Sequence, residues 1–163
     1  MDIVCPLDSQ VLVLTSVQLL RICAGPTARK FPRVQINATK ALAAALNNYA
    51  MLFHSFEAAK EALQCSNALP LSERNMHVDY VTAYSAWQVA RLTSERDRAL
   101  RNDRGRQAHK MAMDALEKAI HQNDQTFISL THEILRKVEE DFPELAADLQ
   151  SAALGTGRDS ASD

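Results

Sequence analysis

Residues 106–141 read RQAHKMAMDALEKAIHQNDQTFISLTHEILRKVEED, and the spacing of their large side chains decides the fold class. Residues that recur at steps of three and four lie on one face of an α-helix. This stripe is formed by Leu116, Ile120, Asn123, Phe127, Leu130, Ile134 and Val138. It predicts one helix from about Arg106 to Asp141, which at about 1.5 Å per residue would be about 54 Å long. A helix of that length indicates an elongated bundle.

Asn123 is the polar member of this stripe. A polar residue at a seam position either sets the register in a partly hydrated core or pairs with its counterpart across an interface. Both interpretations remain open at this point, and Asn123 is therefore a candidate interface residue.

The first predicted helix covers Leu7 to Ala24. It opens after Pro6 and closes at Gly25-Pro26, because Gly accepts a left-handed cap and Pro cannot continue the helix. Its residues 11–20 read VLVLTSVQLL, an apolar run that could imitate a signal peptide, but no Lys or Arg precedes it. We therefore expect a buried helix here.

A second helix is predicted to start after Pro32 and to run to about Ser66, and a third is predicted from about Glu73 to Asn102. The sequence Asn102-Asp103-Arg104-Gly105 favours a break before the last helix. The third helix carries a stripe that starts at Val78, with a second stripe of Tyr80, Tyr84 and Trp87 beside it. It should therefore have two partners, and these three aromatic residues are candidate interface residues. The predicted core comprises Leu42, Leu46, Phe53, Trp87, Leu92, Leu116, Phe127, Leu130 and Ile134.

The composition agrees with an all-α fold. Four Gly and five Pro in 163 residues are too few for the many turns of an all-β protein, and 47% hydrophobic residues are typical of a globular chain. We predict an elongated antiparallel bundle of about four helices, either BAR-like or similar to a four-helix bundle. Residues 1–150 should form a single helical domain, followed by a disordered tail at residues 151–163.

The sequence carries few signs of chemistry. Its three cysteines, Cys5, Cys23 and Cys65, have no zinc-type spacing and indicate a reduced compartment, hence a cytoplasmic location. We find no phosphate-binding loop, nucleophile elbow or metalloprotease motif. The expectation is a protein that is not an enzyme and has no cofactor, no metal site and no small-molecule substrate.

The near-neutral net charge of −2 hides a segregation of charge. Residues 21–40 carry +5, residues 91–110 carry +4, and residues 111–163 carry −7. The candidate residues for binding an anionic membrane or partner are Arg96, Arg98, Arg101, Arg104, Arg106 and Lys110, with Arg29, Lys30 and Arg33. Summed positive charge can hold an anionic surface, whereas the same arginines can also be part of a solvated helical face. Nucleic acid is not expected, because the acidic last third would repel phosphates.

The stretch from Val78 to Gln150 resembles the second half of a BAR domain, especially the sorting-nexin type. The residues that carry the resemblance are Tyr80, Tyr84, Trp87, Arg96, Ala99, Leu100, Phe127, Leu130, Glu133, Ile134 and Phe142. The resemblance implies three long helices that pair with those of a second copy in a curved antiparallel dimer. It also implies that basic side chains on the dimer's face and tips bind anionic lipid headgroups.

Two functions follow as expectations. The first is a non-enzymatic peripheral membrane-binding or membrane-curvature scaffold that acts as a helical homodimer, with peripheral association at internal membranes. The alternative is a helical adaptor that binds an acidic protein partner or a partner helix.

Overall fold

The computed structural model describes residues 7–145, and this part of the chain is all-helical without a strand. Six α-helices and two 3-10 helices follow one another along the chain. Their bounds are α1 (Leu7–Ala24), η1 (Pro26–Lys30), α2 (Pro32–Phe53), α3 (Phe56–Asn67), η2 (Leu71–Glu73), α4 (Met76–Arg91), α5 (Arg98–His121) and α6 (Gln125–Asp141). The predicted all-α class is confirmed, as are the predicted bounds of the first helix. The predicted tail at residues 151–163 lies outside the described residues.

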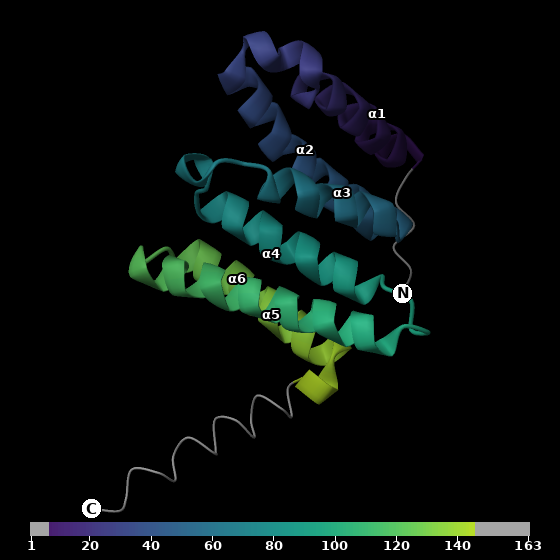
Figure 1. Cartoon of the computed structure of the whole chain (residues 1–163), viewed down its shortest axis with the longest axis vertical. Coiled ribbons are helices and arrows are strands. Elements are labelled where there is room, and N and C mark those ends of the chain that lie inside the picture. Colours follow the sequence, from purple (N-terminus) through teal and green to yellow (C-terminus); the bar gives the residue numbers. More distant parts are fainter. Residues whose placement is uncertain (1–6, 146–163) are drawn as a thin grey trace, which may run out of the picture.

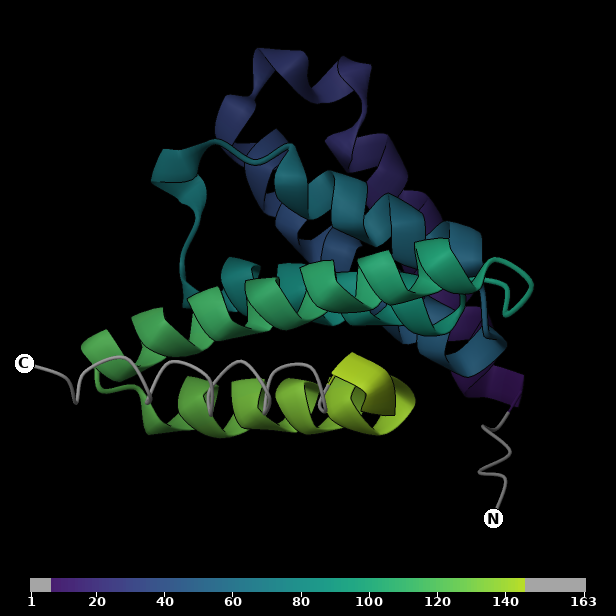
Figure 2. The same ribbon diagram turned by 60° about the horizontal axis from the view of Figure 1, so that its bottom comes forward.

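The helices form a stack of three antiparallel hairpins (Figures 1 and 2). Each helix packs against the next one in the chain, so that α1 with α2, α3 with α4, and α5 with α6 make the three hairpins. The even-numbered helices α2, α4 and α6 also contact one another in turn. A helical bundle is therefore confirmed, with α1 at one end of the stack and the α5–α6 hairpin at the other.

The second predicted helix is two helices. It breaks at His54, whose φ of 49° places it in the left-handed region, and α3 begins directly afterwards. The Ser55 side chain accepts a hydrogen bond from the backbone N–H of Ala58 at 3.2 Å, which caps the new helix. The apolar spacing runs through the break because α2 and α3 both face the same core cluster.

The break predicted at residues 102–105 is wrong. The chain turns earlier, between Arg91 and Arg98, and Asp97 caps α5 by accepting a hydrogen bond from the Leu100 N–H at 3.2 Å. Gly105 lies buried inside α5, where a Cβ atom would come within 2.9 Å of the side chains of Phe142 and Leu145. This glycine permits close packing and does not mark a turn.

The helix predicted from Arg106 to Asp141 is also interrupted. Asn123 has a φ of 53°, and Asp124 caps α6 by accepting hydrogen bonds from Thr126 and Phe127 at 3.1 and 3.2 Å. The longest described helix is therefore α5, with 24 residues and a length of about 36 Å. Asn123 is exposed in the α5–α6 turn and has no place on a helical stripe.

The predicted core is correct in its main members. Leu42, Leu46, Trp87, Leu116 and Ile134 are buried, and the remaining aromatic and aliphatic members are half-buried, with one exception. Leu130 is 37% exposed, because α6 starts anew at Gln125 and turns a different face to the core.

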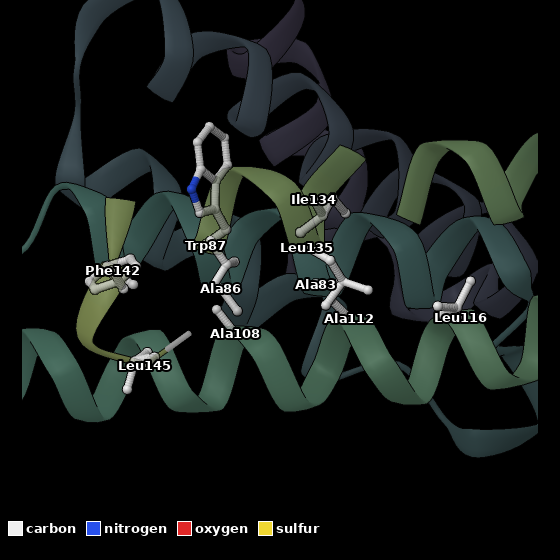
Figure 3. Close-up of a cluster of buried hydrophobic side chains, with 12 residues drawn as sticks. Ala83, Ala86, Trp87, Ala108, Ala112, Leu116, Ile134, Leu135, Phe142 and Leu145 are labelled. Carbon is white, nitrogen blue, oxygen red and sulfur yellow. The ribbon is translucent and has the colours of Figure 1, made fainter. Parts of the chain in front are cut away.

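Helix α4 lies at the centre of the molecule, and eleven of its sixteen residues are buried. It has partners on both sides, as predicted from its two stripes. On the side of α5, small side chains face one another, namely Ala83 and Ala86 on α4 and Ala108 and Ala112 on α5 (Figure 3), and Ala90 belongs to the same buried cluster. These alanines let the two backbones approach closely, and the larger Trp87, Ile134 and Phe142 fill the space toward α6.

Candidate functional site

The basic residues from Arg96 to Lys110 lie in the α4–α5 turn and the first half of α5, and Arg98, Arg101 and Arg104 are among those engaged within the molecule. Arg98 forms an ion pair with Glu144. Arg101 stacks over the Phe142 ring at 4.8 Å from its centroid and reaches the Asp141 carbonyl at 3.5 Å. Arg104 donates to Thr93 Oγ1 at 2.8 Å and lies over Phe56. Arg96, Arg106 and Lys110 are exposed.

A cleft of about 320 Å³ lies beside this turn, and its walls carry both signs of charge. Arg98 and Arg101 face Glu95, Asp141 and Glu144 there. The cleft therefore carries charges of both signs and is not a purely basic surface.

The second basic group, Arg29, Lys30 and Arg33, lies in η1 and the first turn of α2. All three side chains are exposed. Helix α2 runs from η1 to the turn where α3 begins. Its 22 residues span about 33 Å, so this basic group lies about 33 Å from that turn. Arg104 lies over Phe56 at the start of α3, so the two basic groups lie near opposite ends of α2 and do not form one patch (Figure 1).

The aromatic candidates of α4 pack against α6 and α2. Trp87 is buried, and its indole N–H donates to Asp141 Oδ2 at 2.8 Å. Tyr80 lies 6.2 Å from the Phe127 ring, and burial raises the pKa of its hydroxyl. The Tyr84 hydroxyl lies 3.4 Å from the Met51 sulfur. Much of this row thus serves to join helices within one chain, and its predicted role in an interface remains a prediction, as does that of Asn123.

A groove of about 630 Å³ lies between the end of α1, the start of α2 and α3. Arg21 and Glu61 form an ion pair in the wall of this groove. The hydrogen bond from Arg21 to Glu61 raises the pKa of the Arg21 guanidinium. Cys65 also lines the groove, and burial raises the pKa of its thiol. A protonated thiol is a poor nucleophile, so the groove shows no sign of covalent chemistry at this cysteine.

The sequence placed no functional residues on α1, where the structure shows an exposed apolar surface. Val17 is 3% exposed and faces the core, whereas Val11, Leu12, Leu19 and Ile22 are 55%, 67%, 59% and 65% exposed. At 100° per residue these four lie on the side opposite Val17, with Thr15 among them. We call these five residues the outer face of α1. The buried helix expected from residues 11–20 is therefore wrong, because only one side of α1 is covered.

Two hydroxyl groups on and beside this face are satisfied inside the helix. The Thr15 hydroxyl donates to the Val11 carbonyl at 2.9 Å, and the Ser16 hydroxyl donates to the Leu12 carbonyl at 2.8 Å. No residue from Ser9 to Leu20 carries a charge. The outer face of α1 can therefore be buried without leaving these hydroxyls unpaired.

The other end of the stack has a charged surface. Arg136 on α6 is bound bidentately by Glu133, at 2.7 and 2.9 Å, and also pairs with Glu140. Lys137 lies 3.2 Å from the same Glu133. The hydrogen bonds from Arg136 and Lys137 lower the pKa of Glu133 to about 2. This side of α6 is suited to contact with water.

No group of three metal-ligating side chains occurs among residues 7–145. None of the described helices combines the length and apolar composition that a bilayer crossing requires. No protein-family model matches the chain, and neither does any curated protein or solved structure at a significant level.

Proposed function

We propose that the protein is a non-enzymatic helical interaction module whose binding surface is the outer face of α1. The observation that carries the proposal is the exposure of Val11, Leu12, Leu19 and Ile22 on one helix face without an intervening charge. This is the adaptor function expected as an alternative from the sequence, which named an acidic partner or a partner helix, and the apolar outer face favours the partner helix.

The physical argument rests on the composition of α1. A surface helix of a globular protein normally carries charged and polar residues on its solvent side. Helix α1 is apolar on both sides, which is the composition of a helix that is covered all round. Contiguous exposed apolar surface of this kind marks sites of protein–protein contact.

The membrane-scaffold function predicted from the sequence is a weaker proposal on this structure. It depends on basic side chains that are free to meet lipid headgroups, and Arg98, Arg101 and Arg104 have partners within the chain. Nor does α1 suit a membrane surface, because its one basic residue, Arg21, is paired with Glu61.

Site-specific photo-crosslinking in the cell of origin tests the adaptor proposal. A photoreactive amino acid at Leu19 on the outer face of α1 should give discrete crosslinked protein species. The same group at Glu139, an exposed position on α6, is the matched control and should give none of these species. Absence of a crosslink at Leu19, or equal crosslinking at both positions, would contradict the proposal.

A further inference from the structure

The two ends of the helical stack differ in surface chemistry. Stacked helical hairpins bury a continuous core, and their terminal layers need a polar outer surface. The α6 end meets this need with Arg136, Glu133 and Glu140. The α1 end does not, since four large aliphatic side chains of its outer face are more than half exposed. The α1 end is therefore suited to packing against a further helical layer, whereas α6 carries charged residues on its outer side.

The outer face of α1 is complementary to itself. In a two-fold symmetric contact the same patch meets its own copy, so a charge close to the symmetry axis would face a like charge. The outer face of α1 has no charge between Ser9 and Leu20. The hydroxyl of Thr15, at its centre, is already bonded to the Val11 carbonyl.

We propose that a second copy of this chain covers the outer face of α1, so that two stacks join end to end through an α1–α1 pair. This inference rests on the proposed interaction function and names the partner. It places the homodimer contact on α1, whereas the candidate interface residues named from the sequence, Tyr80, Tyr84, Trp87 and Asn123, lie later in the chain.

The available area fits a reversible dimer. A fully exposed aliphatic side chain of this size carries about 100 Å² of apolar surface. The four large aliphatic residues of the outer face are 55–67% exposed. They can therefore bury about 250 Å² in each copy. Since about 65% of a homodimer interface is apolar, the whole contact would cover about 750 Å². This is smaller than a standard specific interface, so we expect a weak dimer with a dissociation constant in the upper micromolar range.

Analytical ultracentrifugation of the full chain across the micromolar range tests this proposal. The wild type should shift with concentration from the chain mass of 18.1 kDa to twice that mass. Leu12→Glu and Leu19→Glu each place two charges in the symmetric contact and should weaken the dimer at least about a hundredfold. Leu71→Glu is the matched control, because Leu71 is 84% exposed in η2 and is not part of the outer face of α1. This variant should dimerise like the wild type.

The variants stay informative about folding as well as association. Both α1 side chains are more than half exposed, so the helical circular dichroism of each variant should match that of the wild type at a concentration where both are monomeric. A wild type that remains at 18.1 kDa throughout would overturn self-association. In that case, a crosslink from Leu19 to a different protein would still leave the adaptor function standing. A dimer that persists in both α1 variants would overturn the assignment of its interface.

Discussion

Gln88 on α4 offers the sharpest test of the packing at the centre of the molecule. Its side chain is fully buried, and neither its amide nitrogen nor its amide oxygen has a hydrogen-bond partner among the described residues. The neighbouring Ser85 hydroxyl is committed to Val81 and accepts from Asn47 at 2.9 Å. The amide of Gln88 is therefore buried without compensation.

The expected effect of removing this amide follows from its cost of burial. An amide taken out of water without a partner costs about 1–3 kcal/mol in proteins. Methionine keeps the unbranched shape and the approximate length of glutamine without the amide, so Gln88→Met should raise the free energy of unfolding by about 1–3 kcal/mol. For a chain of this size the midpoint of thermal unfolding should rise by about 2–4 °C for each kcal/mol.

Urea and thermal denaturation at one fixed protein concentration would measure this change, since self-association links stability to concentration. The urea midpoint should rise while the slope of free energy against urea stays the same. Gln64→Met is the control, because Gln64 is exposed on α3 and its replacement should change the free energy by no more than about 0.5 kcal/mol. A lower stability of Gln88→Met would refute the reasoning, because it would show that the amide makes favourable hydrogen bonds in the folded protein.

Three further predictions concern α5, the α5–α6 turn and α6. Gly105→Ala should lower the thermal midpoint, because a Cβ atom 2.9 Å from Phe142 and Leu145 costs about 1–3 kcal/mol of overpacking, which exceeds the gain in helix propensity of about 1 kcal/mol. Asp124→Ala removes the N-cap of α6 and should lower the free energy of unfolding in urea by about 1 kcal/mol. Asp114 is exposed and does not cap a helix, so Asp114→Ala should lower it by less. The carboxyl of Glu133 should titrate by NMR near pH 2 and nearer its usual value in Arg136→Gln. Because the pKa of Glu133 is lowered in the folded protein, the small contribution of this carboxyl to stability should be complete above about pH 4.5 and disappear as the pH falls toward 2. Equal titration midpoints of Glu133 in the wild type and in Arg136→Gln would show that Arg136 is not the cause of the lowered pKa.

The bounds of α1 were predictable because strong local signals define them. Pro6 and the Gly25-Pro26 pair stand directly outside Leu7–Ala24, where each has a physical reason to begin or end a helix. The all-α class was predictable for a related reason, since helical spacing persists over most of the chain.

The breaks at Ser55, Asp97 and Asp124 were not predicted from the spacing, although each of these residues caps the helix that follows it. The spacing misleads here because consecutive helices pack on the same core, so apolar residues recur on both sides of a turn. The useful signal was the capping residue, preceded in one case by Asn123, which tolerates the left-handed conformation. Gly105 misled in the opposite direction, because the need for a glycine there comes from Phe142 and Leu145, 37 or more residues away in sequence.

The candidate basic residues could be listed from the sequence, but their partners could not. Arg98 pairs with Glu144 and Arg104 reaches Thr93 only because the chain turns back between α4 and α5 and again between α5 and α6. A count of charges along the chain contains no information on such pairing. Two groups that look alike in sequence thus differ in the structure, since Arg29, Lys30 and Arg33 lie exposed at the other end of α2.

The run at residues 11–20 shows why burial depends on the position of a helix in the stack as well as on its sequence. Ten uncharged residues would suit a helix with neighbours on all sides, as α4 has. In one chain, α1 has its main neighbour in α2 and stands at the end of the stack, so only the side of Val17 is covered. The composition of α1 therefore suits a helix that is covered all round, whereas its place in the monomer leaves one side exposed. A second copy at this end would remove the disagreement, because α1 would then become an internal helix of the assembly and its uncharged outer face would lie in the core that its sequence suits.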